Sequence, residues 1–223
     1  MAVRAELESL LRARKLDVTL TTALPAERQD PADLAATGMA LLDRELGGGF
    51  RRGHLSEIVG AQSSGRTSVL CATLTAAAAR GELVALIDTC DRFDPSSAAA
   101  AGLDLSRLLW VRDTGDAARA LKAAMLVLQA GGFGVVAFDL ADVRPLALRS
   151  FPFTTWLRLA RAIEGSETVA VLVAAERLAR SPGGVTVSLE AAAGETRACW
   201  TGVSHRARLL RGITLRPRVI RAR

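Results

Sequence analysis

The chain has 223 residues, half of them hydrophobic, and a formal charge of +6 that arginine carries almost alone. This length allows one sizeable hydrophobic core, and the apolar content excludes a disordered chain. The Ala-rich run 67–79 is too short to cross a bilayer, and the N-terminus lacks the apolar stretch of a secretion signal. We therefore expect a cytoplasmic protein without a membrane segment.

The charge and the cysteines narrow the class further. Excess arginine is typical of proteins that bind nucleic acid or an acidic protein surface, although a GC-rich genome produces the same bias. The three cysteines are far apart and form neither a zinc pattern nor a disulfide framework. We expect no bound metal, and a reducing compartment.

Residues 1–36 are predicted to form an arm distinct from the rest of the chain. An amphipathic helix is expected first, because apolar side chains recur at helical spacing. Its apolar face carries Val3, Leu7, Leu10 and Leu11. A short alternating strand follows at 16–20, and a loop marked by two prolines leads into the core.

Residues 37–223 predict an α/β core. Apolar strands that alternate with helices indicate a mostly parallel sheet covered on both faces. We expect strands at 55–59, 83–87, 108–111, 134–138 and 168–174, and helices at 66–79, 96–101, 116–130 and 151–164. Near the C-terminus, the alternating segments 185–191 and 196–203 predict an antiparallel hairpin, and 209–217 a last strand.

The segment EIVGAQSSGRTS has the outline of a Walker A phosphate loop, G-x-x-x-x-G-K-[ST]. Gly60 and Gly65 have the required spacing, a strand precedes the loop, and a helix follows it. Thr67 occupies the position whose hydroxyl holds magnesium, and Ser68 follows it. Backbone N–H groups of such a loop form an anion-binding concavity at the helix N-terminus.

Two further positions decide what this loop can do. The lysine position holds Arg66, whose wide planar guanidinium does not replace an ammonium in a tight site. Asp139 ends the apolar strand GVVAFD, where a Walker B aspartate holds magnesium through water. An acid at a strand end is common, but the upstream loop favours the Walker B interpretation.

Several segments together resemble RecA. They are TGMALLDRELGGGFRRGHLSEIVGAQSSGRTS, LIDTCDRFDP and GLDLSRLLWV. The resemblance covers roughly residues 37–173, and the predicted arm is similar to the polymerisation arm of RecA. It implies a RecA-like P-loop core of mixed, mostly parallel sheet flanked by helices.

The departures from RecA are as informative. The glutamate that activates water in RecA is replaced here by Cys90, and an unperturbed thiol is a poor base. One DNA-binding loop is reduced to ADVRPLALRS and the other to ERLARSPGG, where Ala175 or Glu176 stands in place of a nucleotide-sensing glutamine. We therefore expect a degenerate ATPase with no catalytic residue, in which ATP and magnesium binding stays doubtful.

A short RecA-like chain with these losses resembles the ImuA family, which is related to SulA-type proteins. This resemblance implies a non-hydrolysing accessory protein of SOS-induced, error-prone translesion synthesis. Its implied partners are RecA, an ImuB-type polymerase-like protein and, indirectly, an error-prone replicative-type polymerase. The alternatives are a weak ATPase in which Asp88 or Asp91 replaces the missing glutamate, and a SulA-type inhibitor of cell division.

The C-terminal segment from Val203 onward contains arginines and no acid. The arginines are Arg206, Arg208, Arg211, Arg216, Arg218, Arg221 and Arg223. They predict a strip that binds DNA phosphates or an acidic partner, or simply the polar face of a solvated strand. Phe151 and Phe153, around Pro152, are either interface residues or lids over the edge of the sheet.

Overall fold

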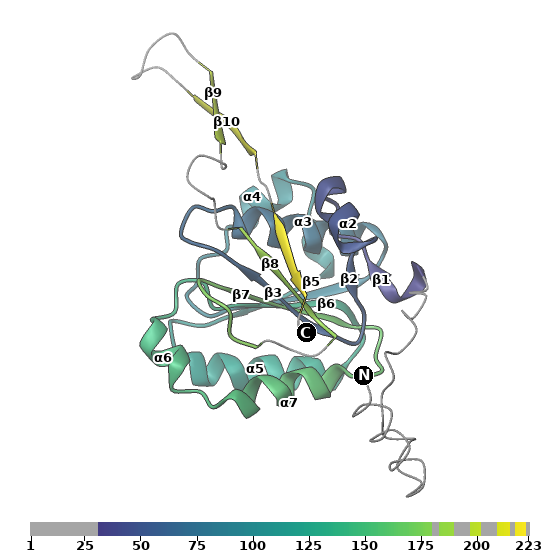
Figure 1. Cartoon of the computed structure of the whole chain (residues 1–223), viewed down its shortest axis with the longest axis vertical. Helices are drawn as coiled ribbons and strands as arrows, with labels where there is room; N and C mark the ends of the chain where they lie inside the picture. Colours follow the sequence, from purple (N-terminus) through teal and green to yellow (C-terminus); the bar gives the residue numbers. More distant parts are fainter. Residues whose placement is uncertain (1–30, 180–182, 190–196, 202–208, 215–216, 222–223) are drawn as a thin grey trace, which may run out of the picture. The chain divides into compact units, whose positions relative to one another are not determined.

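The computed structural model describes residues 31–179, 183–189, 197–201, 209–214 and 217–221 (Figure 1). Its centre is a seven-stranded sheet in the order β11-β8-β3-β7-β6-β4-β5. All neighbouring pairs are parallel except β11 with β8. The strands are β3 (Leu55–Val59), β4 (Leu83–Asp88), β5 (Leu108–Arg112), β6 (Phe133–Asp139), β7 (Val169–Ala174), β8 (Val185–Ser188) and β11 (Arg218–Arg221).

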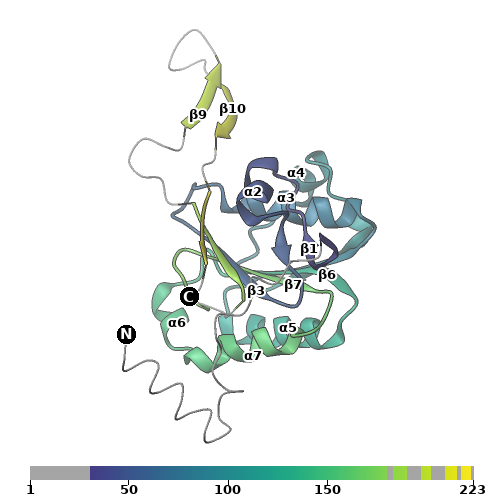
Figure 2. The same cartoon turned by 45° about the vertical axis from the view of Figure 1, so that its right-hand side comes forward.

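Helices cover both faces of this sheet (Figures 1 and 2). One layer packs its apolar side chains into a core that contains Leu42, Leu74 and Ala98, and the other into a core that contains Leu128 and Trp156. The first layer is α2 (Ala40–Leu46), α3 (Arg66–Ala79) and α4 (Pro95–Ala100). The second is α5 (Ala117–Ala130), α6 (Pro145–Arg149) and α7 (Phe153–Ile163). The 3-10 helices are η2 (Pro31–Asp33) and η3 (Leu105–Arg107).

The α/β core predicted from the sequence is therefore confirmed. Strands that are buried on both faces need an apolar residue at nearly every position, and β7 is buried throughout. Helices α4 and α5 begin where Asp94 and Asp116 accept backbone N–H groups of the first turn. No helix within the described ranges is long and apolar enough to cross a membrane.

The C-terminal strands pair differently from the prediction. An antiparallel hairpin is present, but it joins β9 (Arg197–Thr201) to β10 (Leu209–Thr214). The segment expected to pair with β9 is instead β8, which lies in the main sheet between β3 and β11. Alternation along a strand shows which face is buried, but it does not identify the neighbouring strand, and so the pairing was wrong.

Of the predicted arm, only residues 31–36 lie among those described, and Val3, Leu7, Leu10 and Leu11 fall outside them. Residues 31–36 contain η2 and β1 (Leu34–Ala35), which pairs antiparallel with β2 (Phe50–Arg51).

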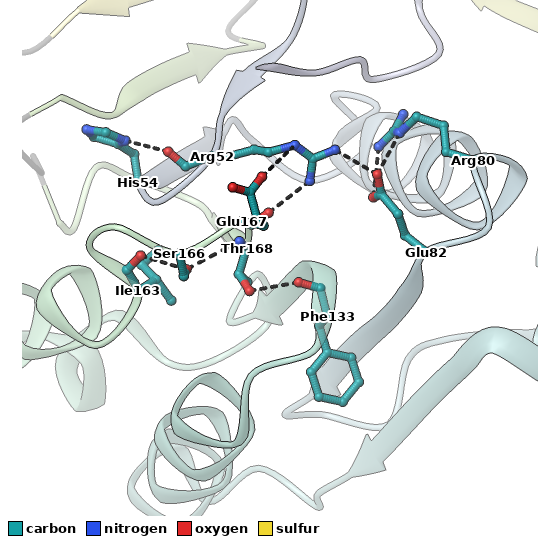
Figure 3. A network of polar contacts seen from close by, with 9 residues as sticks. All are labelled: Arg52, His54, Arg80, Glu82, Phe133, Ile163, Ser166, Glu167 and Thr168. Carbon is teal, nitrogen blue, oxygen red and sulfur yellow. Dashed lines mark hydrogen bonds and ion pairs between the residues drawn. The ribbon is translucent and has the colours of Figure 1, made fainter. Parts of the chain in front are cut away.

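A polar network connects the elements at the amino ends of the parallel strands (Figure 3). Arg52 donates to Glu82 Oε1 at 2.7 Å and to the Glu167 carbonyl at 2.8 Å. Arg80 donates to both carboxylate oxygens of Glu82, at 3.0 and 3.2 Å. His54 Nδ1 lies 2.8 Å from the Arg52 carbonyl oxygen. These contacts fix the segments before β3, β4 and β7, at the end of the sheet away from the phosphate loop.

Candidate functional site

The phosphate-loop motif lies between β3 and α3, at the carboxyl end of the parallel strands. Its backbone is left-handed at Ser63, with φ of 63°, and at Gly65, with φ of 95°. A Cβ atom at Gly60 would lie 2.5 Å from the Ser64 hydroxyl oxygen, so a larger residue there would force the loop to shift. The first N–H groups of α3 have no partner within the helix. The loop therefore keeps the shape of an anion-binding concavity.

Arg66, in the lysine position, is the first residue of α3 and only 7% exposed. Its Nη1 atom is buried and has no hydrogen-bond partner among the residues that the structure describes. The hydroxyls of Ser64, in the loop, and Thr89, after β4, are also buried without a partner. Leaving buried donors unpaired is unfavourable, and an anion in the loop could accept from those that face it. These residues therefore fit a phosphate group.

Asp139 lies beside this loop, at the end of β6, in register with Asp88 on β4. The Ala141 N–H donates to its carboxylate at 2.9 Å. Burial of the carboxyl group is the main cause that raises the pKa of Asp139 to about 6, and the charge of Asp88 adds to it. The positive charge of Arg66 acts in the opposite direction. The structure thus brings the loop and the Walker B candidate to one edge of the sheet.

Thr67 and Ser68, the other predicted loop residues, are exposed on the first turn of α3. Both line a groove of about 670 Å³ that runs between α3 and α4. Its remaining walls consist mostly of small side chains, with Phe93 and Asp94 at the α4 side. Cys71 is half-buried in this groove, and burial raises the pKa of its thiol. The groove is thus open to the phosphate loop.

Cys90, in the position of the activating glutamate, is half-buried just after β4. Burial raises the pKa of its thiol, and the negative charges of Asp142 and Asp139 raise it further. The thiol therefore stays protonated at neutral pH, and it offers no basic group to activate a water molecule.

The two acids named as replacements are already engaged. Asp88 is 1% exposed and accepts the N–H groups of Arg92 and Phe93, both at 2.9 Å, and the Trp110 indole at 3.3 Å. Asp91 accepts two hydrogen bonds from Arg112, each 2.8 Å long. Both carboxylates hold the segment after β4 in place.

Glu57 is a buried acid that the sequence analysis missed. It is 2% exposed, in the middle of β3, the strand that leads into the phosphate loop. Its carboxylate accepts the N–H groups of Leu178 and Ala179, both at 2.7 Å, and the Thr186 hydroxyl at 3.1 Å. An acid inside the apolar strand LSEIV was the available signal, because a buried charge requires partners. Glu57 thus fixes the shortened segment after β7.

The same segment also contacts α6. Arg149 donates to Glu176 at 3.2 Å, and both side chains are at least half-exposed. Glu176, one of two candidates for the position of the nucleotide-sensing glutamine, is therefore in an ion pair with the segment after β6.

The predicted basic strip is described only in part. Arg211 lies in β10, whereas Arg218 and Arg221 lie in β11, and these two strands belong to different sheets. Arg218 is exposed. Arg206, Arg208, Arg216 and Arg223 fall outside the described residues. Within the described ranges, no cluster of three or more potential metal ligands occurs.

Comparison with known proteins agrees with this geometry. Residues 17–147 match the RecA N-terminal domain family. The chain is 36% identical over 115 residues to the RecA protein of Kineococcus radiotolerans, covering 51% of this chain and 32% of that protein. It is 33% identical over 108 residues to RecA of Treponema denticola, and this alignment covers 48% of this chain and 26% of that protein. The aligned part is thus about a third or less of these relatives' length.

Among solved structures, the chain is similar to the RadB recombinase, with a TM-score of 0.53 at 17% identity over 70% of this chain and 83% of that one. The parallel sheet, its two helical layers and the phosphate loop define an α/β P-loop protein of the RecA-like class. The chain belongs to the RecA N-terminal domain family, since the matched residues make up more than half of it.

Proposed function

We propose that this RecA-family chain is a non-hydrolysing accessory protein that acts by binding other proteins. The observation that carries the proposal is the state of the groups around the phosphate loop. The thiol of Cys90 has a raised pKa, while the carboxylates of Asp88 and Asp91 are engaged in hydrogen bonds that hold the chain. No free base therefore stands in the position that activates water in RecA.

Nucleotide binding is compatible with this proposal. Gly60, Gly65 and Arg66 would hold a phosphate group, while Thr67 and Asp139 would hold magnesium. A bound magnesium ion would neutralise charge on the phosphates. Because the pKa of Asp139 is about 6, a cation at this carboxylate would compete with a proton only near and below that pH.

The cellular role we propose is support of SOS-induced, error-prone translesion synthesis. Similarity to ImuA supports this role, and the direct partners would be RecA, an ImuB-type polymerase-like protein, or both. Retention of the RecA-like sheet supports a role beside RecA-like proteins, because that fold presents surfaces of related shape.

Binding assays with purified partners test the proposal. Immobilised chain is exposed to RecA, to an ImuB-type protein and to the division protein FtsZ, each with ATP and with a non-hydrolysable analogue. We expect RecA or the ImuB-type protein to bind equally well with either nucleotide. Failure of both RecA and the ImuB-type protein to bind would contradict the proposal, and binding of FtsZ alone would favour the SulA-type alternative.

A further inference from the structure

The helical layer formed by α5, α6 and α7 contains cations and no acid. Its charged residues are Arg119, Lys122, Arg149, Arg158 and Arg161. The opposite layer differs, because α2 contains Asp43 and Glu45 besides Arg44. Helices α5 and α7 pack side by side, and α6 lies at one end of the same layer in both views (Figures 1 and 2). The charged residues within these three helices are thus all positive.

Each of these three helices also carries one exposed large apolar side chain. Leu126 on α5 is 67% exposed, Leu146 on α6 is 81% exposed, and Phe153 on α7 is 51% exposed. Along α5 the outward positions repeat at helical spacing, with Lys122 one turn before Leu126. Large apolar side chains that gather on one exposed face indicate an interaction site more often than scattered ones do.

The exposure of Leu146 and Phe153 does not come from a loose loop. Leu148, two residues after Leu146, is 5% exposed and packs in the core beneath. Phe151 contacts the ring of the buried Trp156 edge to face, with centroids 6.1 Å apart. The backbone between α6 and α7 is therefore anchored from inside, and Leu146 and Phe153 are held outward.

Several of the cations remain available to a partner. Arg119 pairs with Asp113 at 2.6 Å, and Arg149 with Glu176 at 3.2 Å. Lys122, Arg158 and Arg161 are exposed and form no ion pair with any residue that the structure describes. This face therefore combines unpaired positive charge with apolar anchors.

We infer that the outer face of α5, α6 and α7 binds an acidic segment of a protein partner that carries apolar side chains. Carboxylates would pair with Lys122, Arg158 and Arg161, while apolar groups would cover Leu126, Leu146 and Phe153. A nucleic acid is the weaker fit, because phosphates gain nothing from two exposed leucines. The inference rests on one part of the proposed function, namely that the chain acts by binding other proteins. It does not rest on the loss of hydrolysis.

A designed peptide is the probe. It has about 20 residues, with leucines at i, i+4, i+7 and i+11 of a helix and glutamates at the flanking positions. Its fluorescein-labelled form is titrated with the full chain and followed by fluorescence anisotropy. A labelled scrambled peptide of the same composition and a labelled DNA duplex are titrated in the same way for comparison. We expect the helical peptide to bind at least about tenfold more tightly than the scrambled one.

Two variants separate charge from apolar contact. Lys122→Glu/Arg158→Glu and Leu126→Ser/Phe153→Ser should each weaken peptide binding at least about tenfold. The matched control is Leu41→Ser/Arg44→Glu on α2, where Leu41 is 68% exposed, and its binding should be unchanged. Circular dichroism checks that all variants keep the wild-type fold.

Three outcomes would overturn the inference: no peptide binding, peptide binding by both surface variants that is as tight as that of the wild type, or tighter binding of the duplex that only charge reversal weakens. The last would assign this face to nucleic acid. If the chain hydrolysed ATP while peptide binding behaved as expected, the non-hydrolysing function would fail and this surface would stand.

Discussion

At the scale of single residues, Arg66 and Cys90 make separate changes to the site. Arg66 keeps a positive charge in the phosphate loop, and one of its guanidinium nitrogens has no partner in the described part of the chain. Cys90 removes the group that would take a proton from water, because its thiol has a raised pKa. The first change is compatible with binding an anion, whereas the second is the basis of our proposal that the chain does not hydrolyse ATP. Binding and hydrolysis are therefore separable in this site.

Asp139 gives a pH-dependent test of the site. A carboxyl group whose pKa is raised on folding holds its proton more tightly in the folded chain. Stability therefore falls as the pH rises from about 4 through about 6. Without divalent cations, Asp139→Asn should stabilise the chain at pH 8 by up to about 3 kcal/mol, and this gain should disappear near pH 4. Urea unfolding of the variant and the wild type at both pH values measures this difference in the free energy of unfolding. A stabilisation that is the same at pH 4 and pH 8 would contradict the raised pKa.

The sequence predicted the residues that belong to a motif and missed those that work through tertiary contacts. Gly60, Gly65 and Asp139 were found because their spacing is tied to a strand–loop–helix unit. The hydrogen bonds of Glu57 join it to partners 121 to 129 residues away, which no local pattern displays.

At the scale of elements, the Glu82 carboxylate connects the segments at the amino edge of the sheet, because it accepts hydrogen bonds from both Arg52 and Arg80. Burial alone would raise the pKa of Glu82, but hydrogen bonds from Arg80 and Arg52 outweigh it and lower the pKa. Glu82→Gln should therefore destabilise the chain by about 2 kcal/mol at pH 7, because two charged donors lose their ionised acceptor. The loss should shrink as the pH falls below about 4, where wild-type Glu82 also becomes protonated.

Glu167→Gln is the matched control. Glu167 belongs to the same network, but its side chain is 90% exposed and lies 4.0 Å from Arg52. Its replacement should change the free energy of unfolding by no more than about 0.5 kcal/mol. Equal losses for the two variants would mean that Glu82 does not organise this edge.

Element boundaries in the parallel core were predicted well, for a physical reason. Helix 66–79 and strand 55–59 were predicted with the bounds they have, because composition changes sharply where a buried strand meets a glycine-rich loop. The C-terminal strands were harder to predict. Strand β8 is inserted between β3 and β11, and such non-local pairing leaves no trace in the alternation of its own residues.

At the scale of the whole molecule, two surfaces have different chemistry. The carboxyl edge of the sheet carries the phosphate loop, Asp139 and the groove beside α3. The layer of α5, α6 and α7 carries unpaired cations and exposed apolar side chains. A partner bound to that layer would leave the loop accessible, so nucleotide and protein binding need not compete.

The central claim is that the chain has kept a phosphate loop and lost hydrolysis. The most direct test measures the release of inorganic phosphate from ATP in the presence of magnesium. The wild type is compared with Arg66→Ala, because a contaminating ATPase would contribute equally to both preparations. We predict the same background rate for the two proteins. Phosphate release by the wild type that Arg66→Ala abolishes would contradict the claim.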